Sequence, residues 1–372
     1  MRIVQHALPS YSAGSSRLLR SLHFGAAKSG RKVYIQASLH ADEIPAMLVA
    51  QHLKKKLEQL EQAGQIAGEI VLVPMANPIG LAQDLQGALF GRFELGTGVN
   101  FNRNFKHLTP ALIDKLEGKL GQDAEANTRL IRQTCRTLLE DWLPQTEAES
   151  LKRLLQSLSV DADIVLDLHC DHQAVPHIYA CTQQADAVMP LTAYLGAQAM
   201  LLAKVSGGDP FDESNSRIWW ELAEHFNGRF PIQDACISVT VELRGEVDVE
   251  HGLAQQDAQA MIEYLRQAGH IGGELLSQPA PRCAATPLEG VEPIAAPHSG
   301  LIVYFKAPGD MVAVGEAIGE VIDPFTDQTT PLRSTVAGLL YARISRRYAT
   351  RGMRVAKVAG TQPFRSGKLL SM

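Results

Sequence analysis

The sequence has few of the features that mark membrane, secreted or nucleic-acid-binding proteins. Its 372 residues contain no apolar run that approaches the roughly 20 residues of a transmembrane helix, so no membrane span is expected. The five cysteines include no Cys-x-x-Cys pair, which indicates reduced thiols rather than a disulfide framework. The formal net charge of -5 leaves no basic surface to favour nucleic acid or acidic lipid as a partner.

The remaining composition is that of a soluble globular enzyme, with 45% hydrophobic and 20% charged residues. The first residues lack a charged segment followed by a long apolar one, so a cytoplasmic location is expected. The length favours two domains. Assembly into a homo-oligomer is left open.

Strands and helices alternate through most of the chain, which predicts a mixed α/β sheet with helices on both faces. Residues 1–30 are expected to form an entry hairpin or an edge strand. Buried strands are expected at residues 32–38, 69–74, 162–169, 178–181 and 235–243. Helices are expected at residues 45–62, over much of 110–158, near 186–204 and 214–226, and at 253–267.

The pattern changes after a Pro- and Gly-rich linker at residues 270–290. The following segments are short strands and turns, and residues 296–304 resemble residues 334–341. This repetition predicts a duplicated β unit whose two halves bury their apolar faces against each other. The predicted boundary separates an α/β domain at residues 1–285 from a small all-β domain at 286–372.

Polar residues that suit a metal ion follow two of the predicted strands. His40 and Glu43 lie between the strand at 32–38 and the helix at 45–62. His169 ends the strand at 162–169 and is the preferred third ligand, although an ordinary strand-end histidine is the alternative. Asp167 lies on the same face of that strand and is placed to orient a ligand imidazole. His172 and His177 are rival ligands that follow the strand.

A metal-held water needs a proton acceptor, and Glu242 near the end of the strand at 235–243 is the candidate. The alternative is a buried ion pair with Arg244 or Arg103. Asn102 and Arg103 lie in the irregular loop at 81–106, where an arginine can bind a substrate carboxylate or merely hold the loop together. Arg92 in the same loop either shares that task or faces solvent.

Four motifs in this order resemble the succinylglutamate desuccinylase/aspartoacylase branch of the zinc carboxypeptidase-like fold. They are His40-x-x-Glu43, Asn102-Arg103, Asp167-Leu168-His169 and Glu242-Leu243-Arg244. The resemblance implies a catalytic zinc hydrolase domain at residues 1–285 that binds one Zn²⁺ per chain through His40, Glu43 and His169. It also implies Glu242 as general base and proton donor, and Asn102 and Arg103, with Arg92, as contacts for the carboxylate of a small-molecule substrate.

The reaction implied by the resemblance is hydrolysis of a linear N-acyl amide, so the expected activity is that of a deacylase. The domain at 286–372 resembles a biotinyl/lipoyl-type barrel or sandwich, but neither of its turn-like segments has the expected acceptor lysine. A lid, a wall of the substrate entrance or an oligomer contact is therefore expected of it. The competing hypotheses are a metallocarboxypeptidase and a non-catalytic binding module on the same fold. The metallocarboxypeptidase is disfavoured because the sequence shows no tyrosine near Glu242 of the kind that digestive carboxypeptidases use.

Overall fold

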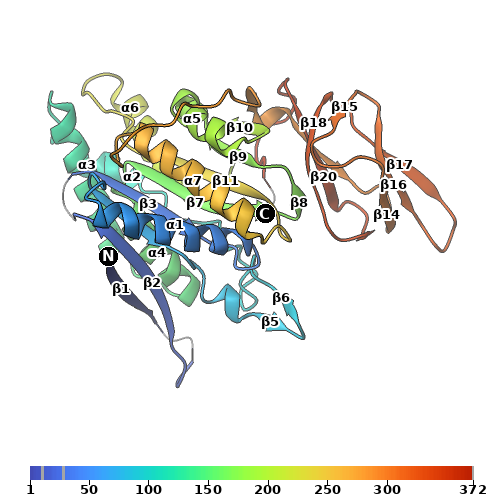
Figure 1. Cartoon of the computed structure of the whole chain (residues 1–372), viewed down its shortest axis with the longest axis horizontal. Coiled ribbons are helices and arrows are strands. Elements are labelled where there is room, and N and C mark those ends of the chain that lie inside the picture. The colour runs from blue at the N-terminus through green and yellow to red at the C-terminus, as the bar shows by residue number, and fades with distance from the viewer. Residues whose placement is uncertain (10–11, 27–29, 371–372) are drawn as a thin grey trace.

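The computed structural model describes residues 1–9, 12–26 and 30–370. Within these residues nine strands form one mixed sheet, in the order β1-β2-β4-β3-β7-β11-β9-β10-β12 (Figure 1). These strands are β1 (Arg2–Leu8), β2 (Arg17–Gly25), β3 (Lys32–Ala37), β4 (Glu69–Val73), β7 (Ile164–Asp171), β9 (His177–Cys181), β10 (Ala199–Ala203), β11 (Ile237–Gly245) and β12 (Ala285–Pro287). The large mixed sheet confirms the α/β class.

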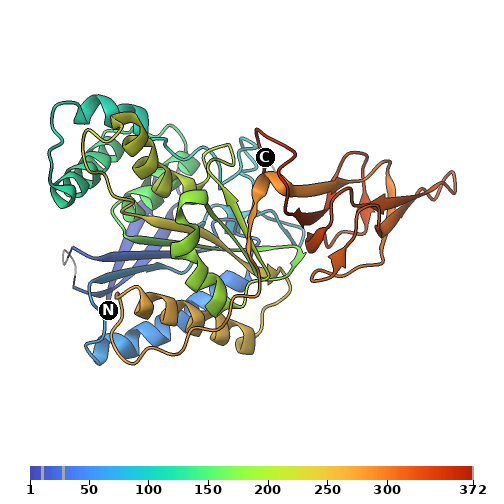
Figure 2. The same ribbon diagram turned by 90° about the horizontal axis from the view of Figure 1, so that it is seen from above.

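Helices cover both faces of this sheet (Figure 2). One face packs against α1 (Pro45–Gln62), α5 (Ala185–Leu195) and α7 (His251–Gln267). The other packs against α2 (Thr109–Leu116), α3 (Ala124–Glu140), α4 (Glu147–Ser159) and α6 (Phe211–Phe226). Burial on both faces explains why the central strands read as nearly continuous apolar runs.

Local signals in the sequence account for where several elements begin and end. Pro45 opens α1 at a position where a missing N–H costs nothing. Asp123 caps α3 as its side chain accepts hydrogen bonds from the amides of Glu125 and Ala126 at 2.9 and 3.1 Å. The irregular loop that follows β4 contains a 3-10 turn and a two-stranded hairpin, namely η1 (Gly80–Ala82), β5 (Asp84–Leu85) and β6 (Ala88–Leu89).

The C-terminal region forms two further small antiparallel sheets around a shared core (Figure 1). The 3-10 turn η3 (Leu288–Gly290) precedes these sheets. Their strands are β13 (Val291–Ala295), β14 (Gly300–Tyr304), β15 (Met311–Val312), β16 (Ala317–Ile322), β17 (Thr329–Arg333), β18 (Gly338–Arg343), β19 (Tyr348–Ala349) and β20 (Arg354–Gly360). The short strand β8 (Gln173–Ala174), which follows β7, pairs with β18 and joins this region to the large sheet. The biotinyl/lipoyl type and the boundary at residue 286 stay predictions.

Two expectations about secondary structure are wrong. The helix expected near residues 186–204 ends at Leu195. It follows the 3-10 turn η2 (Thr182–Gln184), and the rest of the expected helical segment forms strand β10. Gly196 in the left-handed region stops α5, and the short apolar run after it pairs with β9. The linker also contributes β12, which pairs with β10 at the edge of the large sheet.

The hairpin expected within residues 1–30 is present as β1 and β2. Residues 10–11 and 27–29 of that segment, and residues 371–372 of the predicted β domain, lie outside the described residues. None of the described helices is both long enough and apolar enough to span a bilayer.

Candidate metal centre

The carboxyl ends of three neighbouring strands bring the candidate residues together. In the sheet β7 lies between β3 and β11, and both pairings are parallel. Ala37 at the end of β3 pairs with Leu168, while Glu242 in β11 pairs with His169 in β7. The loop after β3 therefore places His40 and Glu43 next to His169, as the sequence predicts for parallel strands.

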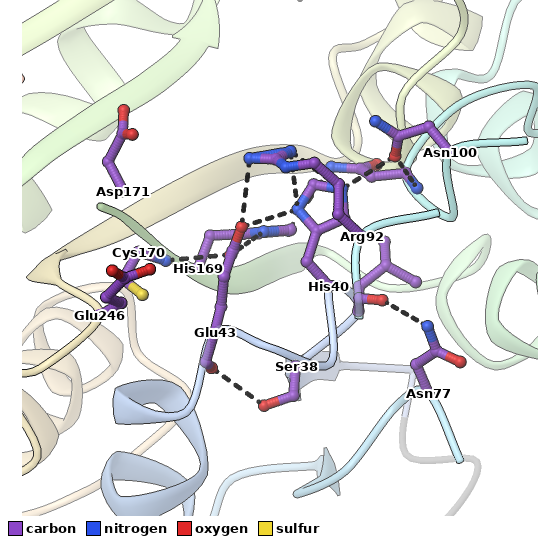
Figure 3. Close-up of polar contacts among 12 residues, drawn as sticks. Ser38, His40, Glu43, Asn77, Arg92, Asn100, His169, Cys170, Asp171 and Glu246 are labelled. Atoms are coloured by element: carbon purple, nitrogen blue, oxygen red, sulfur yellow. Dashed lines mark hydrogen bonds and ion pairs between the residues drawn. The ribbon is translucent and has the colours of Figure 1, made fainter. Parts of the chain in front are cut away.

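Glu43 lies between the two histidines (Figure 3). Its Oε1 lies 2.8 Å from Nδ1 of His40, and its Oε2 lies 2.7 Å from Nδ1 of His169. The backbone N–H of Cys170 also donates to Oε2, at 3.1 Å. All three side chains are buried, with exposed fractions of 3%, 7% and 2% for His40, Glu43 and His169.

The far side of each imidazole is held by another polar group. Nε2 of His40 lies 2.9 Å from Oδ1 of Asn100, and Nε2 of His169 lies 2.9 Å from Oδ2 of Asp167. Asp167 in turn accepts a hydrogen bond from Gln36 at 2.8 Å. These contacts fix the rings so that both Nδ1 atoms face the carboxylate of Glu43. The orienting position predicted for Asp167 is therefore observed.

The donor set fits a divalent transition metal. One ligand atom from each of the three residues lies within 4.8 Å of the others, and the described residues contain no other such group. Two imidazole nitrogens and a carboxylate are a ligand set of catalytic zinc sites, which leave one position open. The geometry therefore shows a site that can hold a metal ion.

The ionisation states of His40, Glu43 and His169 depend on one another. Although burial opposes ionisation, His40 and His169 hold the pKa of Glu43 well below its usual range. Burial and then Arg92 lower the pKa of His40 to about 4, so this imidazole is neutral at pH 7, as a metal ligand must be. Burial acts against the charged form of His169 too, but Asp167 and Glu43 outweigh it and raise that pKa.

Glu242 faces the same cavity and differs from Glu43 in its partners. Its Oε2 is buried and has no hydrogen-bond partner among the described residues. Burial and the nearby charge of Glu43 raise the pKa of Glu242 to about 8. The predicted alternative of an ion pair with Arg244 is wrong, because Arg244 pairs with Asp257 from helix α7. A carboxylate that lines a cavity, and that has no ion-pair partner among the described residues, has the properties of a general base.

The three residues predicted to bind substrate also line this cavity. Arg92 lies over the metal-ligating cluster, with Nη2 3.4 Å from Oε1 of Glu43, so its guanidinium group points toward the cluster although the side chain is 34% exposed (Figure 3). Arg103 lies at the cavity wall and donates to the carbonyl of Asn102 at 2.6 Å. Asn102 accepts from the N–H of Phe211 at 2.8 Å and so also anchors the start of α6.

The rival histidines lie outside the cluster. The side chain of His172 is half exposed and contacts Glu246 at 3.0 Å. His177 is buried in β9, and its Nδ1 lies 2.8 Å from the carbonyl oxygen of Val175. Neither belongs to the group of donors that can share one ion.

Sequence reasoning missed several residues that line the cavity. Tyr179 lies on β9 beside β11 and lines the cavity together with Glu242, and its hydroxyl lies 3.3 Å from that of Tyr341. Lys357 reaches the cavity from β20 of the C-terminal region and pairs with Asp171. Asp212 and Glu213 open helix α6, where acidic residues are common and therefore give no signal of a site. The pairing partners of β9 and β20 are not encoded locally, so their side chains could not be placed.

Comparison with known proteins gives a consistent result. Residues 29–268 match the model of the succinylglutamate desuccinylase/aspartoacylase catalytic domain. A succinylglutamate desuccinylase/aspartoacylase family protein from Shewanella amazonensis is similar in structure, with a TM-score of 0.85, 26% identity, and coverage of 96% of this chain and 98% of that chain. Curated proteins include no match to the sequence.

Two more distant structures share the fold alone. A succinylglutamate desuccinylase/aspartoacylase from Shewanella frigidimarina has a TM-score of 0.83 at 23% identity, with coverage of 96% of this chain and 97% of that chain. The ectoine utilization protein EutE (DoeB) from Ruegeria pomeroyi, in a product-bound structure, has a TM-score of 0.68 at 17% identity, with coverage of 96% and 95%.

Proposed function

Because the chain belongs to the succinylglutamate desuccinylase/aspartoacylase family, and is on that ground a hydrolase, we propose that it cleaves the amide bond of a small N-acylated amino acid or related amine. We further propose that it is zinc-dependent and binds one Zn²⁺ per chain. The observation that carries the proposal is the convergence of His40, Glu43 and His169 beside a carboxylate, Glu242, with no ion-pair partner among the described residues.

The proposed zinc ligands are His40, Glu43 and His169. A zinc ion held there supplies a Lewis acid and lowers the pKa of water into the neutral range. The contacts from Asn100 and Asp167 to the outer nitrogens keep both Nδ1 atoms directed toward Glu43, and these acceptors favour the tautomer with the proton on Nε2 that a metal ligand bound through Nδ1 requires.

Glu242 is the proposed general base. Its Oε2 takes the proton from the attacking water and returns it to the leaving nitrogen, so the products are a carboxylate and a free amine. At a pKa of about 8 the carboxyl group of Glu242 in the metal-free protein is mostly protonated at neutral pH, so it acts as a base only when this pKa is lower. Positive charge in the metal site will lower that pKa from its value in the metal-free protein.

Arg92, Asn102 and Arg103 are the proposed contacts for the carboxylate of the substrate, and Arg92 is also placed to stabilise the developing oxyanion. We propose that the C-terminal region, predicted as residues 286–372, forms one wall of the substrate entrance. Leu288 and Lys357 support this role because both line the cavity. The proposed partners are thus a small-molecule substrate and zinc, in a cytoplasmic enzyme.

A panel assay with Glu242→Gln tests the function. The wild type should release free amine from N-acyl amino acids, and the variant should lose roughly 10²–10⁴-fold in kcat while it retains bound metal. Glu246→Gln is the matched control, because Glu246 contacts His172 outside the metal cluster and should keep its activity. Unchanged turnover in Glu242→Gln contradicts the proposed base. Preferred release of C-terminal residues from peptides would favour the metallocarboxypeptidase, and metal binding without turnover the binding module.

A further inference from the structure

One face of helix α4 carries polar side chains that are buried. Lys152, Gln156 and Ser159 follow one another at the i, i+4 and i+7 spacing of a single helix face, with exposed fractions of 3%, 0% and 0%. Leu151 and Leu155 of the same helix pack into the core, so α4 does not need these polar groups in order to pack. Because a buried polar group costs free energy unless it is paired, the partners of these side chains indicate what this face does.

Gln156 fixes the backbone a short distance after Arg103. Its Oε1 accepts a hydrogen bond from the N–H of Lys106 at 3.1 Å, and its Nε2 donates to the carbonyl oxygen of the same residue at 2.8 Å. Both polar ends of the buried amide are therefore paired with the end of the loop at residues 81–106. The same loop carries Arg103, which lines the cavity and is a proposed contact for the substrate carboxylate.

The turn between Arg103 and Lys106 has a conformation that needs such support. Asn104 has a φ of 58°, in the left-handed region that is uncommon for residues other than glycine. Its N–H donates to the carbonyl oxygen of Gly208 at 2.8 Å, and the N–H of the next residue donates to that of Asp209 at 3.0 Å. A conformation of this kind persists where surrounding contacts over-determine it, so the direction of the Arg103 side chain depends on these contacts and on Gln156.

Lys152 contacts an earlier part of the same loop. Its Nζ donates to the carbonyl oxygen of Asn100 at 3.4 Å, and it lies near enough to Glu94 to interact with its charge. Asn100 in turn holds Nε2 of His40 at 2.9 Å (Figure 3). Lys152 forms no salt bridge among the described residues, so its ammonium group is buried at a cost that core packing does not explain. One residue thus connects this lysine to a ligand of the candidate metal centre.

The alternative is that the polar face merely joins α4 to its neighbours. Ser159 has that role, because its hydroxyl donates to Oδ1 of Asn215 in α6 at 2.8 Å. The side-chain hydrogen bonds of Lys152 and Gln156 differ, since among the described residues they go only to the loop at residues 81–106. That loop carries every residue proposed to bind the substrate carboxylate.

We propose that Lys152 and Gln156 are positioning residues of the active site. Gln156 holds the turn that directs Arg103 toward the substrate, and Lys152 holds Asn100 and, through it, the metal ligand His40. Neither residue touches the substrate or the metal. This inference rests on the proposed amide hydrolysis and its zinc site, and it assigns the two residues to separate steps, substrate binding and metal binding.

Gln156→Leu tests the first assignment. The substitution removes both hydrogen bonds to the loop and keeps a side chain of similar size. With the zinc-saturated enzyme and an N-acyl amino acid, KM should rise about tenfold or more while kcat changes much less, because the loss falls on substrate binding. The zinc affinity should not change. Gln133→Leu, at an exposed position of α3, is the matched control and should keep the KM of the wild type.

Lys152→Met tests the second assignment. The substitution removes the ammonium group and keeps the aliphatic stem. The dissociation constant for zinc, measured by competition with a chelating indicator, should rise about tenfold, the lower end of the effect that loss of an outer partner of a metal ligand has. KM should stay near that of the wild type once the site is saturated with zinc. Lys115→Met, exposed on α2, is the matched control and should bind zinc as the wild type does.

A role in folding alone gives a different result. It lowers the free energy of unfolding in both variants and leaves the KM and the zinc affinity of the folded protein unchanged, and this outcome overturns the proposal. Urea unfolding identifies the conditions in which each variant is folded. Gln156→Met and Lys152→Leu replace a variant that does not fold, with the same expected results.

The proposed function fails in a way that can be told apart. No release of amine from any N-acyl amino acid by the wild type overturns amide hydrolysis, and the assignment of Gln156 with it. The assignment of Lys152 is still decided by the zinc affinity, which requires no turnover. A wild type that binds no zinc overturns the assignment of Lys152 as well.

Discussion

Asp161 at the amino end of the central sheet and Glu242 at the carboxyl end are buried in opposite electrostatic settings, although Asp171 at the carboxyl end of β7 is paired with Lys357. At the amino ends of β3 and β7, Asp161 accepts from Lys32 at 2.6 Å and pairs with Arg136. Although burial opposes it, these cations hold the pKa of Asp161 below its usual value. At the carboxyl ends, burial and neighbouring acids raise the pKa of Glu242 to about 8 and that of Asp212 to about 7.

The difference separates stability from function along the same strands. Paired carboxylates at the amino ends contribute to folding, because their charge is stabilised only in the native state. Unpaired carboxylates at the carboxyl ends cost stability and are retained where a ligand or proton can use them. This agrees with the general rule that open α/β sheets bind ligands beyond the carboxyl ends of their strands.

The largest expected effect comes from breaking the metal centre at the carboxyl end. His169→Ala removes one of three ligands, so we expect bound metal to fall well below one per chain. Activity should fall by more than about 10³-fold, because loss of an outer partner of a ligand alone typically costs 10–100-fold. Metal analysis and turnover measure both quantities. His172→Ala, at a neighbouring half-exposed histidine, should retain metal and activity; equal behaviour of the two variants would disprove the ligand assignment.

At the amino end, Asp161→Asn should reduce stability and leave catalysis intact. The substitution leaves Lys32 and Arg136 without their shared partner. We expect the free energy of unfolding to fall by about 2–3 kcal/mol. This is less than the roughly 3–5 kcal/mol typical of breaking a fully buried ion pair, because the side chain of Arg136 is half exposed. Urea unfolding at pH 7 measures this. Asp114→Asn, on the exposed face of α2, should change stability little. A marked loss of kcat at temperatures where Asp161→Asn is folded would contradict the separation.

The smallest expected effect is on the pH dependence of stability, to which Asp161 at the amino end of the sheet and Asp212 in the cavity contribute with opposite sign. A lowered pKa means that Asp161 stabilises the protein above about pH 4, and that this contribution is lost as the pH falls through its folded pKa. A raised pKa means the opposite for Asp212, whose ionisation costs stability as the pH rises from about 4 to about 7. Asp212→Asn should therefore stabilise the metal-free protein at pH 8, by about 1 kcal/mol or more, and have little effect near pH 4. Unfolding curves at the two pH values test this, and destabilisation at pH 8 would contradict it.

The sequence predicts the convergence of the candidate metal ligands because each part of the cluster has a local signal. Apolar runs mark β3, β7 and β11, and polar residues follow them at their carboxyl ends. Parallel strands bring such ends together, so His40 and His169 could be associated although 128 positions of the chain separate them. The contact of Asp167 with His169 follows from the period of a strand.

The rest of the cavity depends on tertiary structure that leaves no local signal. The short apolar run of β10 has no periodicity that distinguishes a strand from a buried helix. Asp212 and Glu213 read as ordinary acids of a helix N-terminus, and only the packing of α6 against the cavity shows otherwise. Lys357 comes from β20, whose position depends on how the C-terminal sheets join β8.

Titration of zinc into protein stripped by a chelator tests the central claim most directly, with hydrolysis of an N-acyl amino acid as the readout. We expect no activity in the stripped protein, a linear rise with added zinc, and saturation at one equivalent per chain. His169→Ala should show no such rise. Full activity in the stripped protein, or saturation that is unchanged in His169→Ala, would contradict a metal centre formed by His40, Glu43 and His169.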